Sequence, residues 1–289
     1  MTDLHRIIWL ASYPKSGNTW MRSLLAHYFM PKGQAPDINN LRQFTTGDGR
    51  ADFYAMANGG TYDGQGIEDW LRVRPKALRL IAGSKPTHHF VKTHCQAITY
   101  MGQDLIPSEV TAAAVYLLRN PFDVSLSYAR HMNADVDTAI DLMSRRENIM
   151  GSPEHIYDVL GRWDDHIDTW ANAQGLAVHV LRYEDMLTKP GPTLRRLLQE
   201  FLRVKIDSPK LAYAIKATTF DALKKQEEKL GFVERPASSQ SFFTKGTAGA
   251  WREDLTPAQV GRIGEEFGDV IAKWYPEMVD ETAKFAETG

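Results

Sequence analysis

The sequence predicts an α/β fold in which one central, mostly parallel sheet is flanked by helices on both faces. Four short apolar runs are typical of buried strands, and amphipathic helical patterns lie between several of them. No internal repeat and no long Pro/Gly/Ser linker interrupts the chain, so we expect residues 1–289 to form a single domain. The expected strands are residues 7–10, 89–92, 112–118 and 177–181.

Hydrophobic spacing marks the clearest helices. Residues 21–28 carry apolar side chains at i, i+3, i+4 and i+7 directly after the first strand. A second helix opens at residues 192–193 and keeps an apolar stripe to residue 201. A third has Thr256 as its N-cap and proline in its first turn, and its period continues to Trp274.

Composition narrows the class of protein. The 43% hydrophobic and 24% charged residues are globular values. Lys plus Arg is 34 and Asp plus Glu is 36, so a net charge of −2 argues against nucleic acid or anionic membrane as a partner. The single cysteine, Cys95, excludes a disulfide framework and a multi-cysteine zinc site. No apolar run approaches the ~18 residues of a membrane span, and little sequence precedes the first strand, so we expect a cytoplasmic protein.

The segment between the first strand and the first helix indicates an anion site. Residues 13–20 read Tyr-Pro-Lys-Ser-Gly-Asn-Thr-Trp. A strand–loop–helix of small residues directs backbone N–H groups at one point, and Lys15, Ser16 and Thr19 add donors for phosphate oxygens. The lysine precedes the glycine, unlike in a triphosphate-binding loop, so Mg²⁺ and triphosphate chemistry is not implied. An ordinary helix cap with an exposed lysine is the alternative.

Six motifs in order resemble the cytosolic-type sulfotransferases. The loop at 13–20 is similar to their 5′-phosphosulfate loop, and Val-Lys-Thr-His at 91–94 to their catalytic segment. The others are residues 116–128, 182–186, 218–220 and 245–252. The resemblance implies sulfuryl transfer from 3′-phosphoadenosine 5′-phosphosulfate (PAPS) to a hydroxyl or amine, with adenosine 3′,5′-bisphosphate (PAP) released and no metal required. The short N-terminus is more similar to bacterial tailoring members.

The resemblance also implies catalytic roles. His94 would be the general base, Lys15 would neutralise the departing oxygen, Lys92 would steady the sulfonate, and Ser127 would tether Lys15. The residues agree: side chains two apart on a strand share a face, and a neutral imidazole can accept a proton. For His94, the alternative is a core histidine bonded to backbone.

A set of donor-binding residues follows from the same resemblance. Arg119 and Ser127 would hold the 3′-phosphate, and aromatic side chains would surround the adenine, although such aromatics can equally be core residues. Thr218 has a competing role as the N-cap of a helix starting near Phe220. The full set is Lys15, Ser16, Gly17, Asn18, Thr19, Trp20, Arg119, Ser127, Tyr183, Thr218, Phe220, Phe242, Phe243, Lys245 and Gly246.

Two segments depart from the family pattern. Thr244 stands where the C-terminal loop usually has a 3′-phosphate-binding arginine, and Arg235 or Arg252 is the candidate substitute. The valine and glutamate of the usual dimerisation segment fall on Pro257 and Gly261, so we expect that interface not to form as usual and leave the oligomeric state open.

Long, weakly periodic stretches are expected to be mobile loops. Residues 34–66 and 131–160 would line the acceptor pocket, and residues 231–250 would cover the nucleotide. Their apolar side chains predict a small hydrophobic or phenolic acceptor, with helix packing as the alternative. These side chains are Tyr54, Met56, Tyr62, Met132, Met143, Ile149 and Met150.

Two other functions and one metal site are the alternatives to this interpretation. A nucleotide-dependent phosphotransferase would need a Mg²⁺-binding carboxylate, and a non-catalytic nucleotide-binding protein would not need the base His94. A zinc site at His88, His89 and His94 fits no usual ligand spacing, so no metal is expected.

Overall fold

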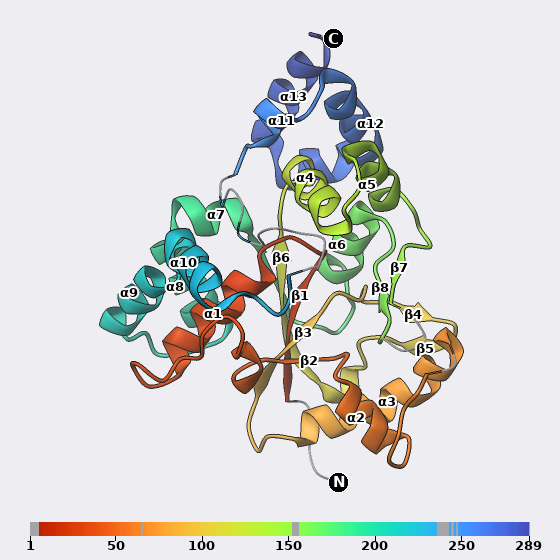
Figure 1. Cartoon of the computed structure of the whole chain (residues 1–289), viewed down its shortest axis with the longest axis vertical. Helices are drawn as coiled ribbons and strands as arrows, with labels where there is room; N and C mark the ends of the chain where they lie inside the picture. The colour runs from red at the N-terminus through yellow and green to blue at the C-terminus, as the bar shows by residue number, and fades with distance from the viewer. Residues whose placement is uncertain are drawn as a thin grey trace.

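The computed structural model describes residues 6–64, 66–151, 156–235, 243, 246 and 248–288. Its centre is a parallel five-stranded sheet in the order β2-β3-β1-β6-β9 (Figure 1). The strands are β1 (Ile7–Ser12), β2 (Thr46–Gly47), β3 (His89–Thr93), β6 (Thr111–Leu118) and β9 (Val178–Arg182). The predicted fold class and all four predicted strands are confirmed. The sequence analysis missed β2, because a two-residue edge strand carries no periodic signal.

Helices cover both faces of the sheet. The helices are α1 (Asn18–Phe29), α2 (Ala51–Ala57), α3 (Ile67–Gly83), α4 (Pro121–Met132), α5 (Val136–Met143), α6 (Trp163–Ala171), α7 (Tyr183–Thr188), α8 (Pro190–Arg195), α9 (Ser208–Ala217), α10 (Phe220–Leu230), α11 (Trp251–Asp254), α12 (Pro257–Trp274) and α13 (Val279–Ala286). Shorter elements are the helical turns η1 (Leu41–Gln43), η2 (Ser108–Val110), η3 (Arg196–Phe201) and η4 (Pro276–Met278), and the paired strands β4 (Thr99–Tyr100) with β5 (Gln103–Asp104) and β7 (Ile149–Met150) with β8 (Asp158–Val159).

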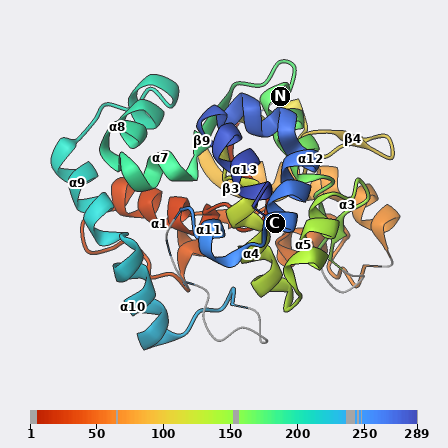
Figure 2. The same ribbon diagram turned by 90° about the horizontal axis from the view of Figure 1, so that it is seen from above.

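Alternation along β1 explains the two-sided packing. Trp9 and Ala11 are buried in one core with residues of α4, α6 and α12, whereas Leu10 belongs to a second core with α1, α8 and α9. Figure 2 shows these two groups of helices on opposite sides of the molecule. A central parallel strand must be apolar on both faces, which is why β1 has no polar alternation.

The predicted helix boundaries are close to the observed ones. Helix α12 begins with a capping box between Thr256 and Gln259, and it ends at Trp274. Helix α8 begins at Pro190, two residues before the predicted start, and continues into the π-helical turn η3.

The stretches expected to be loops carry secondary structure where the structure describes them. Residues 34–66 contain η1, β2 and α2, and residues 131–160 contain α5, β7 and β8. Much of the expected covering loop, including Phe242, Thr244 and Lys245, lies outside the described residues. Among the helices that the structure does describe, none has the length and apolar character needed to cross a membrane.

Candidate active site

The loop after β1 is shaped to expose backbone N–H groups. Lys15 and Gly17 both have positive φ angles, +70° and +95°. Such alternation turns successive N–H groups toward one point at the N-terminus of α1. A Cβ atom on Gly17 would lie 2.6 Å from the ring of Tyr183, so both the backbone angle and the close approach require glycine. The Asn18 amide holds the loop by donating to the Leu10 carbonyl at 2.9 Å.

Ser16 offers an uncommitted polar group in this loop. The residue is 2% exposed, and its buried hydroxyl has no hydrogen-bond partner among the described residues. A buried hydroxyl without a partner is costly, and an anion oxygen at the loop would satisfy it. The loop therefore fits a phosphate or sulfate group.

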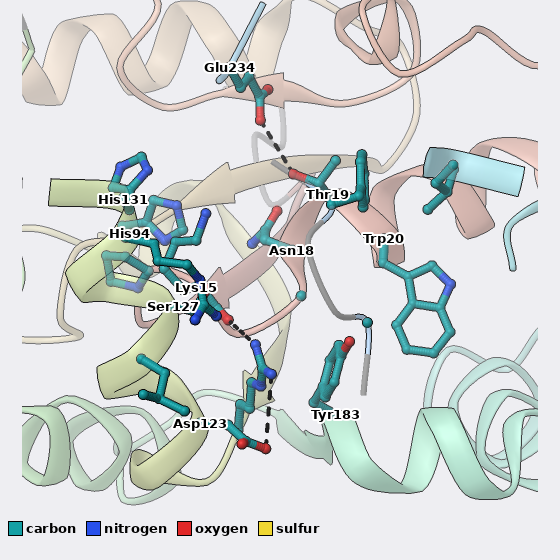
Figure 3. A pocket seen from close by; sticks show the side chains of 18 of the residues that line it. Lys15, Asn18, Thr19, Trp20, His94, Asp123, Ser127, His131, Tyr183 and Glu234 are labelled. Atoms are coloured by element: carbon teal, nitrogen blue, oxygen red, sulfur yellow. Dashed lines mark hydrogen bonds and ion pairs between the residues drawn. The ribbon is translucent and has the colours of Figure 1, made fainter. Parts of the chain in front are cut away.

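Four cationic side chains gather above the loop. Lys15, Lys92, Arg119 and Arg130 line one cavity of about 320 Å³. Ser127 lines it as well, and Figure 3 labels Lys15 and Ser127 among the lining side chains. Burial, and then the nearby charges of Arg119, Arg130 and Lys92, lower the pKa of Lys15 to about 8. These charges repel one another, so the cavity favours a polyanionic ligand.

Arg119 is held in place by its neighbours. Its guanidinium donates to the Lys15 carbonyl at 3.2 Å and lies 4.5 Å from the centre of the Tyr183 ring. Its Nη2 is 3.9 Å from the Asp123 carboxylate. The arginine therefore joins the end of β6 to the loop after β1.

His94 is positioned with a defined tautomer. Its Nδ1 lies 2.7 Å from the Ser12 carbonyl oxygen, which can only accept, so Nδ1 carries the hydrogen and Nε2 carries the lone pair. Burial, and then the charge of Lys92, hold the pKa of His94 well below its usual 6.5. His94 lines the same cavity as Lys15 and Lys92, so the three side chains converge.

Two further side chains fix the backbone of His94. His166 donates from Nε2 to the His94 carbonyl at 3.0 Å, and the Tyr116 hydroxyl donates to His166 Nδ1 at 2.8 Å. Both residues are completely buried. The imidazole of His94 is therefore anchored at its side chain and at its backbone.

Aromatic rings form the other end of the cavity. Trp20 meets Tyr183 edge to face with ring centres 5.4 Å apart, and Phe220 meets Phe243 in the same way at 6.1 Å. All four rings line the cavity, and so does Gly246. The spacing and orientation leave aromatic surface available to a planar ring such as a nucleobase.

Thr218 lies apart from these residues. It is completely buried, and its hydroxyl donates to the Ala214 carbonyl at 2.8 Å. The alternative role predicted for it, as the N-cap of the next helix, is wrong, because Thr219 is the N-cap of α10. The two threonines are adjacent, and sequence alone could not decide which one faces the helix end.

The predicted acceptor side chains do not gather at the cavity. Of the seven, Met150 alone lines it. Tyr54 and Met143 are buried in the hydrophobic cores, whereas Met56 and Met132 are 52% and 41% exposed. Tyr62 and Ile149 pack beside the core formed by α2 and α3. Packing, the alternative, is the better interpretation for four of the seven, whereas Met56 and Met132 are exposed outside the cavity.

Several cavity residues were missed by the sequence analysis. Four of them lie within the quoted motifs at 13–20, 116–128 and 245–252, and the other six come from distant segments that share no local pattern. They are Pro14, Asp123, Leu126, Arg130, His131, Asp158, Leu187, Leu223, Glu234 and Ala250.

Glu234 brings a carboxylate into this cationic site. It accepts from Arg22 at 2.9 and 3.0 Å and from the Thr19 hydroxyl at 3.3 Å. Although burial opposes it, the charges of Lys92 and Arg22 lower the pKa of Glu234 to about 2. The ion pair joins the segment after α10 to α1, next to the loop at residues 13–17, which we call the phosphate loop.

Position 244 holds threonine where the family usually has an arginine, and the structure shows which other arginine side chains reach the cavity. Arg252 pairs with Glu281 and lies over the Trp251 ring, and it does not line the cavity. Arg130 does line it, and its charge acts on Lys15. Arg130 follows Ser127 by three residues, so both project from one side of α4.

A polyanion site at the carboxyl ends of parallel strands defines the class of α/β proteins that bind phosphorylated nucleotides. Within that class, residues 5–275 match the family model described as "Sulfotransferase domain". The chain therefore belongs to the sulfotransferase family.

Curated relatives agree along nearly the whole chain. Sulfotransferase 1B1 of Canis lupus familiaris is 28% identical over 96% of this chain and 84% of its own length. Cytosolic sulfotransferase 1 of Arabidopsis thaliana is 26% identical over 88% of this chain and 75% of its own length.

Solved structures share the fold. Mouse sulfotransferase SULT7A1 complexed with PAP has a TM-score of 0.61 at 18% identity, covering 99% of this chain and 90% of its own. Retinol dehydratase in complex with androsterone and the inactive cofactor PAP has a TM-score of 0.61 at 19% identity. The match covers 92% of this chain and 80% of that chain.

Proposed function

We propose that this protein transfers a sulfuryl group from PAPS to a hydroxyl or amine of a small-molecule acceptor, with His94 as the general base. The observation that carries the proposal is the convergence of Lys15, Lys92 and His94 on one cavity at the loop after β1. The PAP complexes of similar folds support the choice of donor. When bound, PAPS supplies an activated sulfuryl group with the nucleotide as its leaving group.

The cavity residues divide between the parts of the donor. The N–H groups of the loop at Lys15–Thr19, with the Ser16 hydroxyl, hold the 5′ end. Arg119, Ser127 and Arg130 hold the 3′-phosphate, and Arg130 takes the place of the arginine that Thr244 replaces. Trp20, Tyr183 and Phe220 enclose the adenine, because their rings line the aromatic end of the cavity.

The tautomer of His94 suits proton removal. With Nδ1 committed to the Ser12 carbonyl, Nε2 accepts the proton as the acceptor oxygen attacks sulfur. Because the pKa of His94 is low, the imidazole is neutral and ready to accept at neutral pH. Lys15 and Lys92 hold positive charge where negative charge grows in the transition state.

Replacing His94 tests the base. His94→Ala should lower transfer of labelled sulfate from PAPS to a phenol and alcohol panel by roughly 10²–10⁴-fold, with PAP affinity by calorimetry retained. His88→Ala is the matched control, because His88 is exposed and six residues upstream. Unchanged turnover in His94→Ala would remove the assigned base, and a wild-type protein that binds no PAP would remove the proposed function.

A further inference from the structure

Two polar side chains without a role in the proposed reaction, Asp158 and His131, line the cavity beside Met150. Met150 on β7 and Asp158 on β8 are directly opposite each other in an antiparallel pair, so their side chains share a face. Both line the cavity. His131, at the end of α4, lines it as well, and its Nδ1 is buried without a hydrogen-bond partner among the described residues. An acceptor there meets polar groups rather than the apolar wall that the sequence predicted.

Most carboxylates around the cavity already have strong partners. Asp123 accepts from the backbone N–H groups of Gly249 and Trp251 at 2.7 and 3.2 Å. Glu234 accepts two hydrogen bonds from the guanidinium of Arg22. These two side chains hold the protein together and are not available to a ligand cation.

Asp48, just behind the cavity wall, is also neutralised. Its carboxylate lies 2.7 Å from Arg74 and accepts from the Thr93 hydroxyl at 2.8 Å. Arg74 is 1% exposed, so this is a fully buried ion pair. Buried charge is tolerated here because the pair is complete.

Asp158 differs from all of them. In the described part of the chain, no basic side chain lies within 4.0 Å of its carboxylate; its contacts are the backbone N–H of His94 and the Cys95 thiol at 3.9 Å. Burial, and then the charge of Asp48, raise the pKa of Asp158 to about 6, although the charges of Lys92 and Arg74 act in the opposite direction. An incompletely paired carboxylate in a cavity wall is costly, and a ligand cation would relieve that cost.

We propose that Asp158 selects the acceptor, and that the acceptor is a hydroxyl compound carrying a protonated amine. The ammonium lies against Asp158 while the hydroxyl faces Nε2 of His94. The inference rests on the proposed function, because it needs the donor to occupy the other end. Lys15, Arg119 and Arg130 then serve the donor's negative charges, which leaves Asp158 as the carboxylate facing the acceptor.

Matched acceptors test the charge preference. Tyramine and 4-ethylphenol share a phenol and differ by one ammonium; 4-aminobutan-1-ol and pentan-1-ol form an aliphatic pair with a different spacing. We expect kcat/KM with labelled PAPS to favour the cationic member of at least one pair by roughly 10- to 100-fold, the range for a hydrogen bond to a charged group. Neutral members that react as well as cationic ones in both pairs would overturn the inference.

Asp158→Asn should remove that preference. It keeps the size of the side chain and deletes the charge, so kcat/KM for the cationic acceptor falls while that for its neutral partner and the PAP affinity are retained. Asp137→Asn, an exposed carboxylate on α5 outside the cavity, is the matched control and should keep the preference. A preference that persists in Asp158→Asn would assign selection to another residue and contradict the proposal.

A measurement on the wild-type protein covers the case in which the variant does not fold. Phenethylamine should compete with the acceptor, and its neutral analogue ethylbenzene should compete at least tenfold less well.

Oxygen and sulfur atoms of Asp48, Cys95 and Asp158 lie within 4.8 Å of one another, so the protein is first treated with a chelator to remove any bound metal. A preference that needs added divalent metal would assign Asp158 to a metal site instead. Absence of PAP binding would refute the proposed function itself, whereas PAP binding with no charge preference would refute this inference alone.

Discussion

At the scale of single residues, the proposed chemistry depends on how the protein sets protonation states. His94 is neutral because burial and Lys92 disfavour the imidazolium, and the Ser12 carbonyl decides which nitrogen holds the lone pair. Lys15 is destabilised as a cation by burial and by three other positive side chains. A bound polyanionic donor would stabilise the protonated lysine and raise its pKa again, so the charged site favours binding of a polyanion.

These pKa shifts predict the pH profile of kcat/KM, which reports the free enzyme. The base must be deprotonated, and its lowered pKa places the acid limb well below pH 6.5. Lys15 must be protonated to carry its positive charge, and its pKa of about 8 places the alkaline limb at about pH 8. Initial rates from pH 4.5 to 9.5 at low substrate concentration check both limbs. An acid limb at or above pH 6.5 would contradict the assignment of His94.

At the scale of elements, the phosphate loop is the most demanding piece of backbone. Two positive φ angles within three residues turn the N–H groups inward, and the Asn18 amide closes the loop onto β1. The sequence predicted this loop because small and polar residues between a strand and a helix are typical of anion sites. It could not predict Tyr183 as the ring against Gly17, since α7 is distant in sequence.

Gly17→Ala should abolish donor binding. The new Cβ would lie 2.6 Å from Tyr183 in a backbone conformation that alanine disfavours. We expect a more than tenfold loss of PAP affinity by calorimetry and a lower melting temperature. Gly33→Ala is the matched control: it has a φ of +80° but no neighbour within 4 Å, so it should show the backbone effect alone and keep PAP affinity. Equal behaviour of the two variants would mean that the approach to Tyr183 is unimportant.

At the scale of the whole molecule, the sheet order brings the site together. Because β1 lies between β3 and β6, the segments that follow these strands meet at one edge of the sheet. Lys15, His94 and Arg119 come from these three segments. The carboxyl ends of parallel strands are the usual ligand side of such sheets.

The tertiary arrangement places Arg130 in the cavity wall and pairs Arg252 with Glu281, so the proposed donor site predicts different outcomes for the two arginines. Arg130→Ala should weaken PAP binding by more than tenfold while leaving the affinity for adenosine 5′-monophosphate nearly unchanged, because the 3′-phosphate loses a charged partner. Arg252→Ala should leave both affinities unchanged, because Arg252 is committed to Glu281. Calorimetry with the two nucleotides measures both effects. A loss of PAP affinity in Arg252→Ala alone would contradict the assignment.

By itself, the sequence determined the fold class, the four longer strands, the loop at residues 13–20 and the placement of Lys92 and His94 on one face of a strand; that Lys15 joins them depended on β1 lying beside β3. These features follow from local periodicity and from side chains near the ends of neighbouring strands, which a linear pattern records. Only the tertiary structure decided that Thr219 rather than Thr218 caps α10, that Arg252 turns away to Glu281, and that Asp158 faces the cavity. Those outcomes depend on packing and charge pairing between segments far apart in the chain, and no local pattern encodes them.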